Sequence, residues 1–209
     1  MNVIILGPQG SGKGTQAQML VDRYGFYCFE AGGFLRRLAN TDPDVNEKLN
    51  RGELIDDDRM FELVKRELMK KGVFDQVVFD GYPRSVRQWE LLKEWLGSRG
   101  AEVDLVIFLD ISEVETVRRL SARRLDRKTG KIYNLITSPP GSDVDLGDLV
   151  QRDDDKEAAI KERLNEYREN TVPLLEVFEK EGKLVKLDGE RPIEEIFEDI
   201  AHLIGGKSE

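Results

Sequence analysis

The stretch Gly7-Pro-Gln-Gly-Ser-Gly-Lys-Gly-Thr15 is the most informative part of this chain. It follows the apolar run Asn2–Leu6 and leads into the helical pattern Lys13–Tyr24, which predicts a strand, a glycine-rich turn and a helix start. Backbone N–H groups in such a turn converge on a phosphate, and the helix N-terminus adds a partial positive charge. Lys13 can reach the outer phosphates and Thr15 can offer a hydroxyl to Mg²⁺. The stretch therefore predicts a nucleoside triphosphate site.

The loop departs at one place from the usual phosphate-binding pattern. Gly14 stands where Ser or Thr is expected, and Thr15 follows one place later. The residues expected to hold the triphosphate are Gly10, Ser11, Gly12, Lys13, Gly14 and Thr15.

A second segment, Phe79-Asp80-Gly81-Tyr82-Pro83-Arg84, follows another apolar run. A carboxylate such as Asp80 at a strand end beside a phosphate loop is placed to hold Mg²⁺ through its waters. Arg84 projects over the same edge. Gln88, one helical turn further, faces the same way, and its amide suits the edge of a base. A cationic cluster also indicates a small anionic ligand in an otherwise acidic protein, unless it is a solvated helix face: Arg118, Arg119, Arg123, Arg124 and Arg127.

Composition narrows the class of protein. The 209 residues, 39% hydrophobic and 35% charged, suit one globular core with inserted segments. A net charge of −9 argues against a nucleic-acid-binding surface, and no run approaches the roughly 18 apolar residues of a membrane span. The single cysteine, Cys28, excludes an internal disulfide, and the first strand leaves no room for a signal peptide. We expect a cytoplasmic protein.

Strand and helix patterns alternate without hairpin signals, which predicts an α/β fold with a parallel sheet of about five strands flanked by helices. The strand candidates are Asn2–Leu6, Tyr27–Phe29, Gln76–Asp80, Leu105–Asp110 and Lys183–Leu187. The helix candidates are Lys13–Tyr24, Gly33–Asn40, Asp57–Lys71, Ser85–Arg99, Glu113–Arg123, Lys156–Glu181 and Pro192–Ile204.

Two segments interrupt this alternation. Residues 30–56 have short helices and no strand, and residues 122–155 form a turn-rich flap. Long insertions of this kind are often functional lids. The predicted core domain is therefore 1–29, 57–121 and 156–209, with two inserted mobile subdomains.

Taken together, Gly7–Ala17 and Asp80–Gln88 resemble the P-loop nucleoside monophosphate kinases, and most closely the adenylate kinases. Similar motifs follow in the family's order at Gly32–Arg36, Gly52–Asp57, Arg119–Tyr133, Arg152–Arg163 and Asp188–Pro192. The resemblance spans essentially the whole chain. It implies reversible transfer of the terminal phosphoryl group of MgATP to AMP, giving two ADP, with Mg²⁺ as the cofactor.

The resemblance also implies site roles. The resemblance gives a catalytic role to Lys13, Arg84, Arg119, Arg123, Arg152 and Arg163, and it implies that Asp154 orients the arginines. In addition to the phosphate loop, the residues that it places beside ATP are Arg119, Arg123, Ile132, Tyr133 and Arg191. Beside AMP it places Ala31, Gly32, Arg36, Glu53, Leu54, Ile55, Gly81, Tyr82, Pro83, Arg84, Gln88, Arg152 and Arg163. Residues 30–56 would close over AMP and residues 122–155 over ATP, excluding water.

The sequence departs from the family pattern in the AMP segment and in the lid. Glu30-Ala31-Gly32-Gly33 replaces the usual Ser-Thr-Gly-Asp, so Ala31 lacks a hydroxyl expected to touch AMP, and Gln9 replaces a common proline. Residues 122–155 contain no cysteine, so we expect no zinc site. Either a hydrogen-bonded network replaces the zinc or the lid aspartates are only solvated. The residues available for such a network are Tyr133, Thr137, Asp143, Asp145 and Asp148.

Two alternatives to an adenylate kinase stay open. A UMP/CMP kinase of the same family is one, although those relatives tend to carry Asn at the position of Ser85 and to lack Gln88. A non-catalytic nucleotide-binding module is the other, although it would not need the arginines. We expect a monomer with the nucleotides ATP, AMP and ADP as its partners, and no nucleic-acid or membrane partner.

Overall fold

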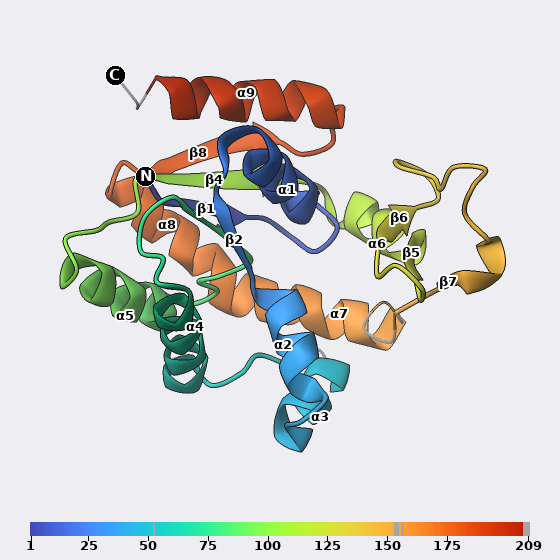
Figure 1. Ribbon diagram of the computed structural model, residues 1–209, viewed down its shortest axis with the longest axis horizontal. Coiled ribbons are helices and arrows are strands. Elements are labelled where there is room, and N and C mark those ends of the chain that lie inside the picture. Colours follow the sequence, from blue (N-terminus) through green and yellow to red (C-terminus); the bar gives the residue numbers. More distant parts are fainter. Residues whose placement is uncertain (52, 153–154, 156, 207–209) are drawn as a thin grey trace.

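A computed structural model describes residues 1–51, 53–152, 155 and 157–206. Its main sheet is parallel throughout and has the strand order β2-β3-β1-β4-β8 (Figure 1). The strands are β1 (Val3–Leu6), β2 (Tyr27–Glu30), β3 (Val77–Asp80), β4 (Leu105–Asp110) and β8 (Leu184–Asp188). The predicted parallel α/β sheet is confirmed, and the strand bounds differ from the predicted ones by one residue at most at each end.

Helices cover both faces of the sheet (Figure 1). Side chains alternate along each strand, so Val3 and Ile5 of β1 point to one apolar cluster while Ile4 and Leu6 point to another. The first face is covered by α1 (Lys13–Tyr24) and α9 (Ile193–Gly205), and the second by α4 (Asp57–Lys71), α5 (Val86–Gly97) and α8 (Val172–Lys180). Burial on both faces explains why the strands are almost wholly apolar.

The carboxyl ends of the strands meet at one edge. Gly7 follows β1, and Asp80 and Asp110 are the last residues of β3 and β4. In the register of the sheet Ile5 pairs with Asp80, so the phosphate loop begins beside this carboxylate. Ligands bind at this edge in open α/β sheets.

The segment after β2 consists of α2 (Ala31–Ala39) and α3 (Pro43–Arg51), which pack against each other below the sheet in Figure 1. The predicted helix over residues 33–40 begins two residues earlier than expected, because the Glu30 carboxylate caps it by accepting from the N–H of Gly33.

The second inserted segment is a small antiparallel sheet that follows α6 (Glu113–Ser121). Its strand order is β6-β5-β7, and its elements are β5 (Arg123–Asp126), β6 (Ile132–Asn134), the 3₁₀ helix η1 (Leu146–Asp148) and β7 (Leu149–Val150). The predicted helix Glu113–Arg123 was therefore too long. Arg123 belongs to β5, whose pairing with β6 takes over the backbone hydrogen bonds.

Hydrogen bonds hold this small sheet together, but their centres differ from the expected residues. Asp126 accepts from the N–H of Lys128 at 2.8 Å and from the Thr129 hydroxyl at 2.6 Å. Asn134 donates to the Arg119 carbonyl at 2.9 Å. Among the lid residues named from the sequence, Asp148 pairs with Lys128 at 2.6 Å. The second inserted segment therefore has polar contacts within it, centred on Asp126, and Asn134 ties it to α6.

The predicted helix over 156–181 agrees with a helical run over residues 157–180, but this run is not α-helical throughout. It consists of α7 (Glu157–Glu166), a π-helical turn η3 (Tyr167–Thr171) and then α8. Pro173 lacks an N–H, and its ring crowds the carbonyl four residues earlier, so the regular helical ladder cannot continue through it. The N–H of Val172 instead bonds to the Tyr167 carbonyl, five residues back.

Candidate active site

The phosphate loop is arranged to receive an anion. Gly12 has φ +95°, a left-handed conformation that favours glycine, and α1 begins at the next residue with no acidic side chain in its first turn. The positive end of α1 is thus not offset by a carboxylate on its own helix. Lys13 folds back over the loop, and its Nζ donates to the carbonyls of Gly7 and Pro8, each at 2.8 Å.

The surroundings of Lys13 and Asp80 shift the pKa values of both side chains strongly. Burial lowers the pKa of Lys13 to about 7, with Asp80 opposing the shift and Arg84, Arg163 and Arg123 adding to it. Burial likewise raises the pKa of Asp80 to about 6, although nearby Lys13 opposes this. Three arginines close enough to Lys13 to affect its pKa show that cationic side chains converge at the loop. Such convergence is typical of a polyphosphate site.

Gly14 stands where the phosphate-loop pattern has Ser or Thr, and the closeness of Asp80 explains why a glycine fits there. A Cβ on this residue would lie 3.2 Å from Asp80 Oδ2, closer than most side-chain contacts allow. The hydroxyl residue is therefore displaced to Thr15, which is exposed one position further along α1.

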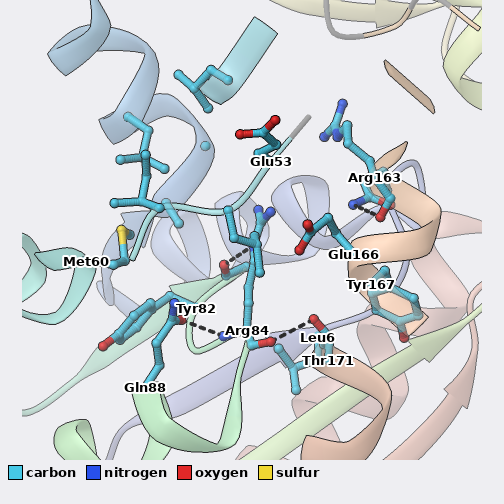
Figure 2. Close-up of a pocket in the computed structure, with 18 of the residues that line it drawn as sticks. Leu6, Glu53, Met60, Tyr82, Arg84, Gln88, Arg163, Glu166, Tyr167 and Thr171 are labelled. Carbon is cyan, nitrogen blue, oxygen red and sulfur yellow. Dashed lines mark hydrogen bonds between the residues drawn. The ribbon is translucent and has the colours of Figure 1, made fainter. Parts of the chain in front are cut away.

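A pocket lies between the phosphate loop, α2 and the π-turn (Figure 2). Most of the residues assigned to AMP from the sequence line it, namely Ala31, Gly32, Arg36, Glu53, Leu54, Ile55, Gly81, Tyr82, Arg84, Gln88 and Arg163. Lys13 lines the same pocket. Gln9 and Leu35, which lie within the predicted motifs but were given no site role, also line the pocket. No local motif pointed to the remaining lining residues Leu49, Met60, Glu166, Tyr167 and Thr171.

Arg84 is held by its main chain as well as its side chain. Its N–H donates to Gln88 Oε1 at 2.8 Å, and its Nε donates to the Gly81 carbonyl at 2.8 Å (Figure 2). Gln88 also donates through Nε2 to Asp57 at 2.8 Å. The Gln88 amide, predicted to face a base, thus makes two protein contacts and keeps one N–H and one acceptor lone pair for a ligand.

A buried carboxylate joins two of the predicted arginines. Both oxygens of Asp155 accept from Arg123, and one lies 3.7 Å from Arg163 Nη1, while the Asp155 side chain is fully buried. From the sequence, Asp154 was given the orienting role, and it lies outside the described residues. Arg152 is three residues before Asp155, whose N–H donates to the Arg152 carbonyl at 3.1 Å.

Apart from Arg123, the side chains predicted beside ATP lie in three places. Arg119 is held by Glu115 at 2.7 Å, and its Nη1 donates to the carbonyls of Gly189 at 2.9 Å and Gly10 at 3.4 Å, which brings it to the phosphate loop. Arg191 pairs with Asp199 at 2.7 Å near the start of α9. Ile132 and Tyr133 are on β6 of the lid, with Ile132 exposed and Tyr133 buried.

Glu30 is a further residue that the sequence did not mark as functional. Its Oε1 accepts from the N–H of Gly33 at 3.0 Å and from Arg36 Nη2 at 2.8 Å. A Cβ on Gly33 would lie 2.1 Å from Glu30 Oε2. The carboxylate thus occupies the space that a side chain at position 33 would need, so the two departures from the family pattern depend on each other.

The donor chemistry at the strand edge fits Mg²⁺. A buried carboxylate with a raised pKa gains from a nearby divalent cation, and Asp80 lies beside the first turn of α1. Within the described residues, no group of three or more His, Cys, Asp or Glu side chains is placed to hold a metal ion directly. None of the helices in the described residues has the length and the apolar character of a membrane span.

Comparison with known proteins shows one family. The family described as Adenylate kinase matches residues 5–183. An adenylate kinase of Kosmotoga olearia is 38% identical over 208 residues, which cover 96% of this chain and 97% of the relative. Adenylate kinases of Archaeoglobus fulgidus, 36% identical over 98% of both chains, and Salinibacter ruber, 39% identical over 94% of both, are also similar.

Proposed function

This chain belongs to the adenylate kinase family and is a phosphotransferase, and we propose that it transfers the terminal phosphoryl group of MgATP to AMP, giving two ADP. The observation that supports this most is the convergence of Lys13, Arg84 and Arg163 on one pocket, with Arg123 joined to Arg163 through Asp155. Phosphoryl transfer needs positioned positive charge far more than covalent assistance from the protein.

We assign the two nucleotides to opposite sides of this cationic cluster. The loop residues 10–15 and Arg119 would hold ATP, because Arg119 reaches the loop through the Gly10 carbonyl. Gly32, Arg36 and residues 53–55 would enclose AMP, because they line the pocket with Arg84 and Gln88. Planar guanidinium groups suit the spread charge of a transferring phosphoryl group.

Mg²⁺ bound with ATP would neutralise charge on the outer phosphates, held near Asp80 and Thr15 mainly through water. The protein groups would align the two phosphates and exclude water when residues 30–56 and 122–155 close over them. We also propose a cytoplasmic monomer. The partly buried Cys28, whose pKa burial raises to about 12, suits a reducing compartment.

A screen of phosphate acceptors tests this function. With MgATP as donor and ADP formation as the readout, we expect AMP to be used far better than GMP, CMP or UMP. A mimic that joins two adenosines through five phosphates should inhibit and should bind one molecule per chain. Preference for a pyrimidine would indicate a UMP/CMP kinase, and tight nucleotide binding without turnover would indicate a non-catalytic module.

The pairing of Glu30 with Gly33 leads to a prediction about AMP. Gly33→Asp alone should lower Tm slightly and raise KM for AMP, because the flexible Glu30 side chain must swing away and lose its hydrogen bonds to the Gly33 N–H and to Arg36. Adding Glu30→Ser should restore both values, since serine also caps a helix but is shorter. Thermal melts and AMP titrations of the two single variants and the double variant measure the coupling. Strictly additive effects would contradict this account.

A further inference from the structure

The π-turn η3 connects two parts of the site that are distant in sequence. Thr171, its last residue, is buried, and its hydroxyl donates to the Arg84 carbonyl at 3.0 Å across 87 residues of chain (Figure 2). Arg163 lies on α7, the helix that leads into this turn. We propose that Thr171 is a positioning residue for phosphoryl transfer, which fixes Arg84 relative to Arg163. The inference rests on the proposed function.

Local hydrogen bonds hold both the main chain and the side chain of Arg84. Its N–H is bonded by Gln88 and its Nε by Gly81, and both partners lie within four residues of it in sequence. These local bonds shape the loop after β3 but do not tie it to the rest of the site. The bond from Thr171 ties this loop to the α7–α8 helix.

The π-turn itself brings Thr171 to this place. A π-helical turn contains one more residue than an α-helical turn, which rotates the residues at its end by about 100° relative to an unbroken helix. The widened turn is supported by Asn170, whose Nδ2 donates to the Glu166 carbonyl at 3.2 Å and to the Glu166 carboxylate at 2.8 Å. Tyr167 and Thr171 both line the pocket. Departures of this kind from regular helix geometry are frequent at functional sites.

Thr171→Val tests the proposal because it removes the hydroxyl and keeps the shape. We expect kcat/KM for AMP to fall about 10- to 100-fold, the effect of a small misplacement of a catalytic group, with KM for ATP unchanged within about twofold. Thr171→Ser, which keeps the hydroxyl, should stay within about threefold of the wild type. Thr116→Val is the matched control, because Thr116 is buried on α6 and its hydroxyl has no hydrogen-bond partner among the described residues.

A double-mutant cycle separates positioning from a general loss of structure. In an Arg84→Ala background the carbonyl of residue 84 remains, but the guanidinium that the Thr171 bond positions is gone. Thr171→Val should therefore change the remaining rate by less than about twofold in that background. An equal loss in both backgrounds, or wild-type activity of Thr171→Val, would overturn the proposal. If the valine variant does not fold, Thr171→Ala removes the same hydroxyl. A wild-type chain that forms no ADP from MgATP and AMP would refute the proposed function itself.

Discussion

Lys13→Met should lower kcat by about 10³-fold and at the same time raise the melting temperature by a few degrees at pH 7. The loss of rate follows from the loss of the charge that reaches the outer phosphates. The gain in stability follows from burial, which lowers the pKa of Lys13 to about 7 in the folded chain, against 10.5 for a free lysine. Folding therefore carries a cost whenever this lysine is charged.

The pH dependence of this effect has a definite sign. Between pH 7 and about 10.5 the unfolded chain keeps a proton on Lys13 that the folded chain releases, so wild-type stability gains from rising pH through this group. The methionine variant lacks this gain. The difference in Tm between variant and wild type should therefore be largest near pH 6.5 and smaller near pH 9.5.

Melts of the two proteins at these pH values, with Lys70→Met as a control at an exposed lysine, measure the effect. A variant that melts below the wild type at pH 6.5 would contradict the interpretation that Lys13 carries a desolvated charge in the folded chain. A variant with a near-normal rate would remove Lys13 from the catalytic group.

Arg84→Ala should lower kcat by about 10³- to 10⁵-fold, the range for an arginine that contacts a transferring phosphoryl group. The fold should persist, because the contacts of the Arg84 main chain with Gln88 and Thr171 do not involve its side chain. Arg84→Lys should be intermediate, since it keeps the charge but not the planar fork.

The control for this variant is Arg87→Ala. Arg87 follows in the same segment but makes an exposed ion pair with Asp58 at 2.8 Å, which contributes little to stability or rate. Initial rates with MgATP and AMP, together with circular dichroism, distinguish catalytic loss from unfolding. If Arg87→Ala lowered the rate as much as Arg84→Ala, the rate would depend on the conformation of the whole segment and not on the Arg84 guanidinium.

Where local patterns were strong, the sequence predicted the elements well. The helices Lys13–Tyr24 and Asp57–Lys71 have the predicted bounds, because each has an apolar face of helical period and a glycine just after its end. The helix predicted over residues 156–181 was also found, but the sequence did not indicate the π-turn that precedes Pro173. It also gave no bounds for the three short strands β5, β6 and β7. β5 and β6 are neighbours in sequence, but β7 pairs with β5 from more than twenty residues away.

Local sequence patterns were enough to predict the parallel sheet, the phosphate loop at the edge where its strands end, and the cationic residues, because periodicity and turn chemistry act over a few neighbouring residues. The partners that hold these cations depend instead on the packing of the whole chain. Asp155 meets Arg123 across 32 residues, and Thr171 meets Arg84 across 87. Such contacts are set by how distant segments pack, and no local pattern encodes which segments will meet.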